Sequence, residues 1–361
     1  MKRETPLVEA YCIRVPKYLG ERAIKVADKL DLLNKNLRVL RVGDWLLVPL
    51  TGEPEKEKLA TLKREINQFE ILIQEFPKRE KTIKSIFDAL EGKLPQHLLA
   101  ALPRSIDFIG EVAILEIPRE LEDYKRLVGE AILQAFKRVK SVLAKSGVTS
   151  GVYRLREYEV IAGSEDTETI HKEYGCKYYL DPRKVYFSPR LSYEHSRVAS
   201  QVREGETIID MFAGVGPFSI LIAKTHRNVT VYAIDINPEA IKYLKRNIRA
   251  NNVDGKVIPI LGDAKEAVNK RLRGIADRVI MNLPEKAIEY VNAACSALKS
   301  SGGIIHYYEF ARGTDAVKKV RNRIIEAVGK TGRNVVAVLS ERIVKEVAPF
   351  KWQVAVDVKV Q

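Results

Sequence analysis

A glycine-rich segment, residues 210–219 (Asp-Met-Phe-Ala-Gly-Val-Gly-Pro-Phe-Ser), carries the residue types that hold a nucleotide-like ligand. The apolar run before it and the helical run after it predict a strand, a tight turn and a helix. Glycines permit the turn and let a ligand reach the backbone, while the first turn of the helix offers free N–H groups. Ser219 replaces the third glycine of the dinucleotide pattern, which argues against a nicotinamide dehydrogenase.

Three further predicted strands end in polar side chains, at Asp235, Asp263 and Asn282. Asp235 could accept ribose hydroxyls, Asp263 could accept an adenine amino group, and Asn282 can both donate and accept at a base edge. Pro284 stiffens the last turn. A capping role for Asp235 and a common Gly-Asp turn at Asp263 are the alternatives. Because ligands bind beyond the carboxyl ends of parallel strands, we expect these strand ends to form one site.

The elements that position these residues alternate between strand and helix over residues 166–361. Predicted strands cover 207–211, 230–236, 256–261, 278–282, 303–308, 334–339 and 352–360. The last two lack a full helix between them and should pair antiparallel. The pattern predicts an α/β domain with a seven-stranded, doubly wound sheet.

Two smaller α+β domains are expected before this sheet. Residues 1–50 read as a strand, a helix over 21–33 and two short strands with a turn at Gly43-Asp44, and residues 51–58 read as a linker or the start of a solvated helix. Residues 59–165 include predicted strands at 112–117 and 152–160 and a long helix over 120–145. Arg154 and Arg156 share one face of the last strand, which suggests a phosphate or base contact, or simply a solvated face.

The overall charge favours a polyanionic partner. The 361 residues carry a formal net charge of +14, and 46% of them are hydrophobic, as in a globular protein. No apolar run is long enough for a membrane span, and the first residues lack the apolar core of a signal peptide. The three cysteines lie far apart and indicate neither a zinc site nor a disulfide framework. We therefore expect a cytoplasmic protein that uses no metal.

Several motifs together resemble the archaeal and eukaryotic tRNA (guanine-37 N1) methyltransferases. They are Phe-Ser-Pro-Arg-Leu-Ser at 187–192, Glu194, the 210–218 loop and Asn-Leu-Pro at 282–284, and the likeness spans nearly the whole chain. The resemblance implies a tRNA-elbow module, a middle RNA-binding domain and a C-terminal Rossmann-like class I domain. It further implies a monomer that transfers methyl from S-adenosylmethionine to N1 of guanine 37 in the anticodon loop. Some archaeal members also methylate C7 of the wyosine precursor 4-demethylwyosine.

The resemblance also assigns site residues. Glu194 would remove the N1 proton, with a pKa raised by burial, Arg154 would donate to guanine O6, and Asn282 with Pro284 would hold the base edge. A surface glutamate in a salt bridge, a phosphate-binding arginine and a turn asparagine are the respective alternatives. The cofactor would be held by Tyr186, His195, Asp210, Phe212, Gly214, Gly216, Asp235, Ile236, Asp263, Ala264 and Asn282, although His195 could equally be an ordinary exposed histidine.

Other activities fit the motifs less well. Adenine N6 methyltransferases carry Asn-Pro-Pro-Tyr, whereas this chain has Leu283 at the first proline and Glu285 at the tyrosine. Cytosine C5 methylation needs a nucleophilic cysteine, and no cysteine lies at a predicted strand end of the cofactor domain. A ribosomal RNA methyltransferase and a catalytically silent RNA-binding protein stay open as alternatives.

Overall fold

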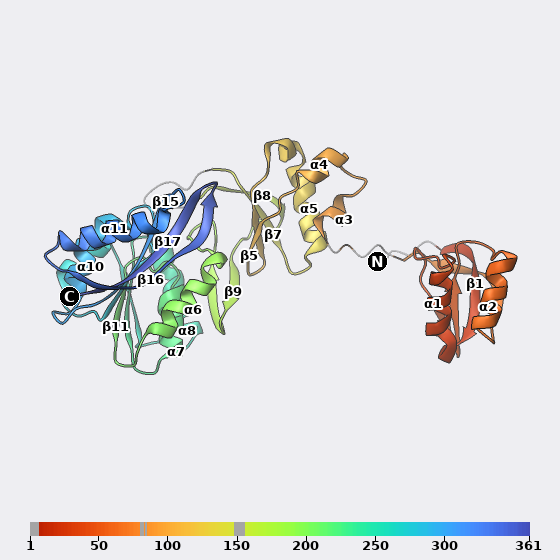
Figure 1. The fold of residues 1–361 in the computed structure, drawn as a ribbon, viewed down its shortest axis with the longest axis horizontal. Helices are drawn as coiled ribbons and strands as arrows, with labels where there is room; N and C mark the ends of the chain where they lie inside the picture. The colour runs from red at the N-terminus through yellow and green to blue at the C-terminus, as the bar shows by residue number, and fades with distance from the viewer. Residues whose placement is uncertain (1–6, 80–82, 84, 148–155) are drawn as a thin grey trace. The chain divides into compact units, whose positions relative to one another are not determined.

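The computed structural model describes residues 7–79, 83, 85–147 and 156–361 (Figure 1). The chain divides into two compact units, Met1–Ile83 and Lys84–Gln361. Each unit has its own apolar core, and each is described by itself.

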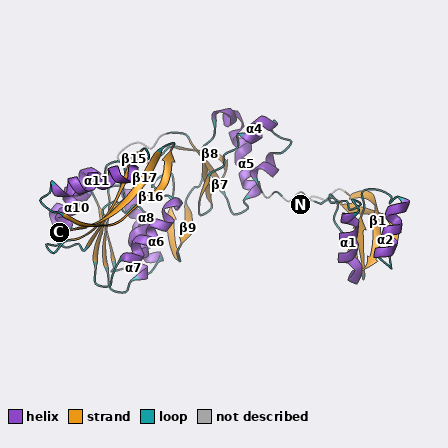
Figure 2. Ribbon diagram, in the orientation of Figure 1, coloured by secondary structure: helices purple, strands orange, loops and turns teal. Residues whose placement is uncertain are grey.

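The N-terminal unit is a four-stranded antiparallel sheet with two α-helices (Figure 2). Its elements are β1 (Leu7–Pro16), η1 (Lys17–Leu19), α1 (Gly20–Lys29), β2 (Leu40–Val42), β3 (Trp45–Pro49), α2 (Lys56–Glu65) and β4 (Glu70–Pro77), with strand order β2-β3-β1-β4. The domain boundary expected at residue 50 is too early, because β4 pairs with β1 along its whole length. The expected linker at 51–58 runs into α2, whose end contributes buried Leu62 and Ile66 to the core.

The second unit begins with a smaller α+β layer of strand order β5-β6-β7-β8. Its elements are α3 (Ile86–Leu90), α4 (Gln96–Ala100), β5 (Ile106–Ile109), β6 (Val112–Leu115), η2 (Arg119–Tyr124), α5 (Lys125–Ala135), β7 (Ser141–Lys145) and β8 (Tyr158–Gly163). The long helix expected over 120–145 is wrong. The helix ends at Ala135, and β7 pairs parallel to β6, where Val142 and Leu143 are buried. Arg154 lies outside the described residues, and Arg156 precedes β8.

A seven-stranded mixed sheet forms the rest of the unit, as predicted. A hairpin of β9 (Thr169–Glu173) and β10 (Cys176–Leu180), then η3 (Pro189–Leu191) and α6 (Ser192–Gln201), precede it. The sheet and its helices are β11 (Thr207–Asp210), α7 (Pro217–Thr225), β12 (Thr230–Asp235), α8 (Pro238–Ala250), β13 (Val257–Leu261), α9 (Ala264–Ala267), η4 (Val268–Leu272), β14 (Arg278–Met281), η5 (Ala287–Tyr290), α10 (Val291–Ala297), β15 (Gly303–Arg312), α11 (Ala316–Gly329), β16 (Val335–Ala348) and β17 (Lys351–Val360).

The strand order β13-β12-β11-β14-β15-β17-β16 places the site. Five strands run parallel, and β17 is antiparallel to both β15 and β16. Successive strands are added toward one edge of the sheet from β11 to β13 and toward the other edge from β14 onward. Ligands bind beyond the carboxyl ends of the strands at such a switch point, which here lies between β11 and β14. One core cluster lies under α6, α7 and α8, and another lies under α10 and α11, so helices cover both faces. In the described part of the chain, no helix is long and apolar enough to cross a membrane.

Candidate cofactor site and adjoining cleft

A cavity of about 250 Å³ lies at the carboxyl ends of β11, β12, β13 and β14. Four consecutive strand–helix turns build it, as the polar strand ends predict. Its walls include these predicted site residues: Tyr186, Phe212, Gly214, Asp235, Ile236, Asp263, Ala264, Asn282 and Pro284. They also include Asn237, which belongs to the same turn as Asp235 and caps α8. Tyr290, Phe310 and Gln353 line the cavity too, and the sequence carries no local signal for them because tertiary packing brings them in.

The glycine loop lies tightly against the helix layer. Gly214 and Gly216 have φ values of 56° and 91°, which side chains rarely adopt. Gly216 is the N-cap of α7, and a Cβ at this position would overlap Leu244 Cδ1 on α8. The Gly214 N–H donates to Asp235 Oδ2 over 2.7 Å, so the ends of β11 and β12 are held together.

Asp210 lies fully buried beneath this loop rather than in the cavity wall. The hydroxyl of Ser219 donates to its Oδ2 over 2.7 Å, whereas its buried Oδ1 has no hydrogen-bond partner among the described residues. Burial raises the pKa of Asp210 to about 7. Such a carboxylate suits a ligand that brings a positive charge, because that charge would favour the ionised form.

Asp235 and Asp263, the two carboxylates expected to hold the nucleoside, already accept hydrogen bonds from other residues of the protein. Asp235 also accepts from the N–H of Asn237, and burial raises its pKa. Asp263 caps α9 through the N–H of Lys265 at 2.8 Å and accepts from the Tyr290 hydroxyl at 2.9 Å. Asp263 thus stands in a Gly-Asp turn that caps α9 and lies in the cavity wall as well. The capping alternative for Asp235 is wrong, because Asn237 is the residue that caps α8.

A hydrogen bond from β17 orients the side chain of Asn282, a contact that the sequence motifs did not predict. Gln353 on β17 donates through Nε2 to Asn282 Oδ1 over 3.2 Å. That bond turns the amide oxygen toward β17, so the NH₂ group of Asn282 is the part suited to donate to a bound base.

A second cleft of about 320 Å³ adjoins the cofactor cavity and shares Tyr186, Glu285 and Phe310 with it. Five cations from the smaller layer, η3 and the β16–β17 hairpin line it: Lys145, Arg156, Arg190, Lys345 and Lys351. Three acids, Asp107, Glu285 and Glu346, line it as well, and Asp107 pairs with Arg190 at 2.6 Å. Burial lowers the pKa of Lys345 to about 8, with the charge of Arg190 acting in the same direction. The cleft can therefore hold an anionic group beside the cofactor.

Glu194 is 1% exposed on α6 and lines neither cavity. Its Oε2 accepts from Arg197, Arg342 and the hydroxyl of Tyr308, and its Oε1 accepts from Arg342 Nε over 2.8 Å. Burial alone would raise the pKa of this carboxyl, but the two arginines outweigh it and the pKa is lowered. The expected raised pKa is therefore wrong.

The position of Glu194 is nevertheless close to the strand ends of the site. Its partner Tyr308 follows Tyr307 on β15, which is paired with Met281 on β14. Since Asn282 follows Met281, the tyrosine that bonds Glu194 lies on the strand next to the one that leads to Asn282.

His195 does not reach the cofactor cavity. It is 1% exposed, its Nδ1 lies 2.7 Å from Glu173 Oε1, and its ring packs edge-on against Phe218. Burial alone would raise the pKa of Glu173, but the adjacent His171 and His195 outweigh this effect and lower the pKa to about 2. His195 therefore does not line the cofactor cavity, and the exposed-histidine alternative is wrong.

Comparison with known proteins agrees with this geometry. Family models match residues 12–58 (tRNA methyltransferase 5 N-terminal domain), 86–167 (TYW2 N-terminal domain) and 169–336 (TRM5/TYW2 methyltransferase domain). The tRNA (guanine(37)-N(1))-methyltransferase Trm5b of Pyrococcus abyssi is 41% identical over 351 residues, which are 96% of this chain and 98% of that protein.

Two further relatives widen the comparison. The tRNA 4-demethylwyosine(37)-methyltransferase Taw21 of Saccharolobus solfataricus is 40% identical over 71% of this chain and 94% of its own. The solved complex of aTrm5 with tRNALeu is 34% identical, with a TM-score of 0.81 over 99% of this chain and 100% of that chain. The resemblance predicted from the motifs is thus confirmed, and the chain belongs to the TRM5/TYW2 methyltransferase family.

Proposed function

We propose that this protein transfers the methyl group of S-adenosylmethionine to N1 of guanine 37 in tRNA. The observation that carries the proposal is the junction of the two cavities. A nucleoside-sized cavity at the strand ends shares Tyr186 and Phe310 with a cleft lined by five cations. A methyl donor in the first cavity would therefore face a guanine nucleotide in the second, where the cations would hold its phosphates and the O6 atom of its base.

The residues of the first cavity fit the cofactor. When bound, the sulfonium donor supplies an electrophilic methyl group. The Gly214 loop would lie against its methionine end, with the buried acceptor of Asp210 compensating its ammonium charge. Asp235 would accept from the ribose, and Asp263, Ala264 and Tyr290 would enclose the adenine.

The chain's own residues would prepare the acceptor. Asn282 would donate to the base edge, and Arg156 of the cleft would stabilise negative charge developing on O6. The resemblance gives that role to Arg154, which lies outside the described residues. Glu194 would take the N1 proton as the N1–CH₃ bond forms and the sulfur–carbon bond breaks. Among the described residues its Oε1 accepts a single hydrogen bond, from Arg342, so one acceptor position is left for that proton.

A second acceptor is favoured by a specific observation. The TYW2 N-terminal model matches residues 86–167, and Taw21, at 40% identity, is named for the 4-demethylwyosine base at position 37. We therefore propose C7 of that base as an additional acceptor. We further propose that the protein acts in the cytoplasm, as a monomer and without a metal.

The acceptor position is tested with tRNA transcripts. Transcripts that carry guanine at position 37 should accept methyl groups, and matched transcripts with adenine there should not. Equal methylation of both transcripts, or methylation of ribosomal RNA fragments in preference to tRNA, would contradict the assigned target.

Cofactor affinity should depend on pH through Asp210. Its pKa of about 7 in the free protein should fall when a positively charged ligand binds, so S-adenosylmethionine affinity should rise with pH from about 5.5 to 7.5, by up to tenfold per pH unit below 7. Asp210→Asn, which cannot ionise, should remove this dependence. Calorimetric titration at several pH values measures both, and an unchanged profile in the variant would show that Asp210 is not coupled to the cofactor.

Removal of the N-terminal unit should separate RNA binding from cofactor binding. The unit has its own sheet and core, so a chain beginning at Lys84 should keep the affinity for S-adenosylmethionine. Its affinity for tRNA should fall, because the unit proposed to bind the tRNA elbow is missing. Filter binding and calorimetry measure the two affinities, and loss of cofactor binding would contradict this division of roles.

A further inference from the structure

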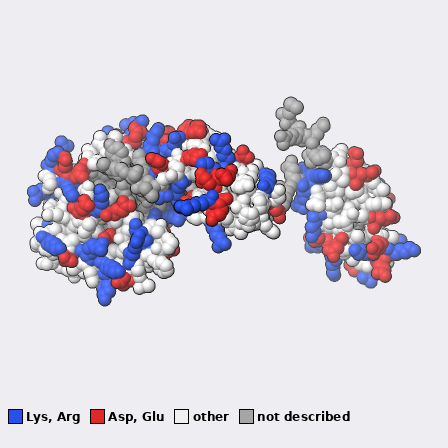
Figure 3. All heavy atoms as spheres, turned by 90° about the horizontal axis from the view of Figure 1, so that it is seen from above, with Lys and Arg blue, Asp and Glu red and all other residues white. Residues whose placement is uncertain are grey.

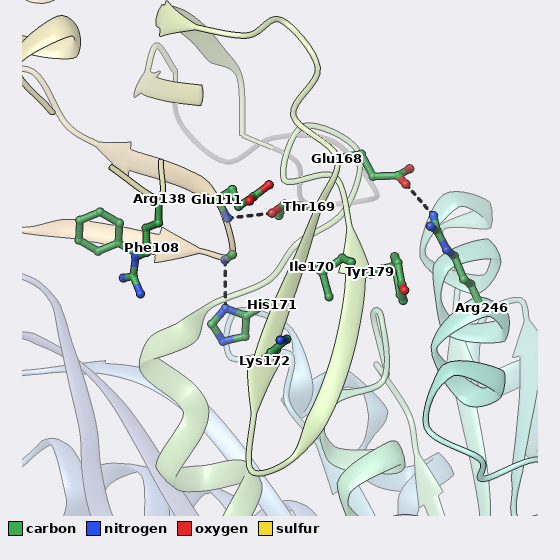
Figure 4. Close-up of a pocket in the computed structure, with 11 residues that line it drawn as sticks. Phe108, Glu111, Arg138, Glu168, Thr169, Ile170, His171, Lys172, Tyr179 and Arg246 are labelled. Atoms are coloured by element: carbon green, nitrogen blue, oxygen red, sulfur yellow. Dashed lines mark hydrogen bonds and ion pairs between the residues drawn. The ribbon is translucent and has the colours of Figure 1, made fainter. Parts of the chain in front are cut away.

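A third hollow, of about 610 Å³, lies on the opposite side of β5 from the basic cleft. Phe108 lines this hollow, whereas its neighbours Asp107 and Ile109 line the cleft, as alternation along a strand requires. The turn after β5, the outer face of the β9–β10 hairpin and α8 form its walls (Figure 4). It is separate from the cofactor cavity, and no residue is shared between them.

Two arginines stacked on aromatic rings stand at the ends of the hollow. The guanidinium of Arg138 lies 5.2 Å from the ring centre of Phe108, and that of Arg246 lies 3.8 Å from the ring centre of Tyr179. Figure 4 shows these pairs on either side of the hairpin. Stacking fixes the plane of a guanidinium while its N–H groups stay available to phosphate oxygens.

The acidic residues of the hollow are already neutralised. Glu111 pairs with Lys140 at 2.7 Å, and Glu168 is bound by Arg246 at 2.6 Å, which lowers the pKa of Glu168. By contrast, Arg138 and Lys172 make no ion pair with any residue that the structure describes. The hollow therefore presents uncompensated positive charge.

The hairpin itself places like charges together. Lys172 and Lys177 are directly opposite across β9 and β10, and both are exposed. Opposed like charges destabilise a strand pair. A polyanion bound over the hairpin would remove this repulsion.

The positive surface continues along α8. Arg246 also lines a neighbouring hollow together with Lys242, Lys245 and Arg249, and no acidic residue lines that hollow. Lys and Arg side chains occur all over the face drawn in Figure 3, where they alternate with Asp and Glu. The cations on the β9–β10 hairpin and α8, with no unpaired acid lining the two hollows, thus indicate an anion-binding surface more specifically than the net charge does.

We propose that the outer face of the β9–β10 hairpin and α8 binds the sugar-phosphate backbone of the RNA substrate outside the target loop. Spaced cations and stacked arginines suit a regular row of phosphates, and they read no base sequence. The identity of this RNA as tRNA rests on the proposed function. The surface itself takes no part in methyl transfer.

The test removes three exposed lysines of this surface, in the variant Lys172→Ala/Lys177→Ala/Lys245→Ala. A matched control, Lys270→Ala/Lys318→Ala/Lys330→Ala, loses the same net charge from exposed positions elsewhere in the unit. The dissociation constant for tRNA is measured from 50 to 300 mM salt. For the surface variant, the slope of log affinity against log salt should become shallower by about 0.7–0.9 for each phosphate that is no longer neutralised, and KM for tRNA should rise about tenfold or more.

The control should retain the wild-type slope, and both variants should keep wild-type kcat, melting temperature and affinity for S-adenosylmethionine. Lysine-to-arginine replacement at the same three surface positions should restore binding, which excludes a folding defect. Equal slopes in the surface variant and the control would overturn the proposal. If the wild-type protein bound tRNA through this surface but methylated no guanine, the proposed function would fail and this inference would stand.

Discussion

Glu194→Gln is expected to lower kcat for guanine N1 methylation by about 10²–10⁴-fold, the usual contribution of a general base. Glutamine keeps the shape and the acceptor oxygen of the side chain, but it cannot take up the N1 proton. Arg342 and Arg197 keep the glutamate ionised, as its lowered pKa indicates, so the loss should persist across the neutral pH range. Single-turnover methylation of a tRNA transcript measures the effect.

The acceptor atom provides the control. At C7 of 4-demethylwyosine the ring carbon attacks the methyl group first, and the C7 proton leaves to water only after the carbon–carbon bond has formed and the sulfur–carbon bond has broken. No N1 proton must be removed to make that nucleophile, so Glu194→Gln should reduce C7 methylation much less. Affinity for S-adenosylmethionine should not change, because Glu194 does not line the cofactor cavity. Equal losses at both acceptors would show that Glu194 supports the structure of the site and is not the N1 base.

Gly216→Ala is expected to destabilise the protein by about 2–4 kcal/mol and to weaken cofactor binding at least tenfold. At φ 91° an alanine is strained, by about 1–2 kcal/mol, and its Cβ would overlap Leu244 and lie 3.0 Å from Ile220 Cδ1. Relief of the overlap must turn the buried Leu244 side chain or shift the loop, and Gly214 of that loop lines the cofactor cavity. Thermal unfolding and calorimetry measure the two effects.

Gly255 provides a control that separates the effect of backbone strain from the effect of steric overlap. Gly255 has a similar φ of 81°, and no atom lies within 4 Å of the Cβ that alanine would add. Gly255→Ala should therefore cost only about 1 kcal/mol and leave cofactor affinity unchanged. If the two variants behaved alike, close packing of the glycine loop against α8 would not matter for the site.

Local patterns predicted much of the cofactor domain. Its strands are short apolar runs bounded by polar strand ends, so all seven could be placed from the sequence, including the β16–β17 hairpin. The length of β16 could not be predicted from the sequence. It extends to Ala348, nine residues beyond the predicted end, and this extension brings Arg342 and Lys345 to Glu194 and to the basic cleft.

Other errors arose where tertiary contacts override local pattern. Residues 130–145 contain no glycine or proline and look like one continuous helix, yet residues 141–145 form β7 because β6 offers a buried parallel partner. The sequence motif likewise identified Glu194 and His195 but not what surrounds them. Arg342 lies 148 residues after Glu194, and Glu173 lies on a hairpin that was not predicted. A side chain's pKa depends on such partners, so it could not be derived from the motif.

The most direct measurement is nucleoside analysis of the product. Unmodified tRNA transcript is incubated with the wild-type protein and S-adenosylmethionine carrying a labelled methyl group, then digested and resolved by mass spectrometry. We predict that the label appears as 1-methylguanosine, in the fragment that contains position 37. Label on another nucleoside or at another position, or S-adenosylmethionine binding with no transfer at all, would contradict the proposed function.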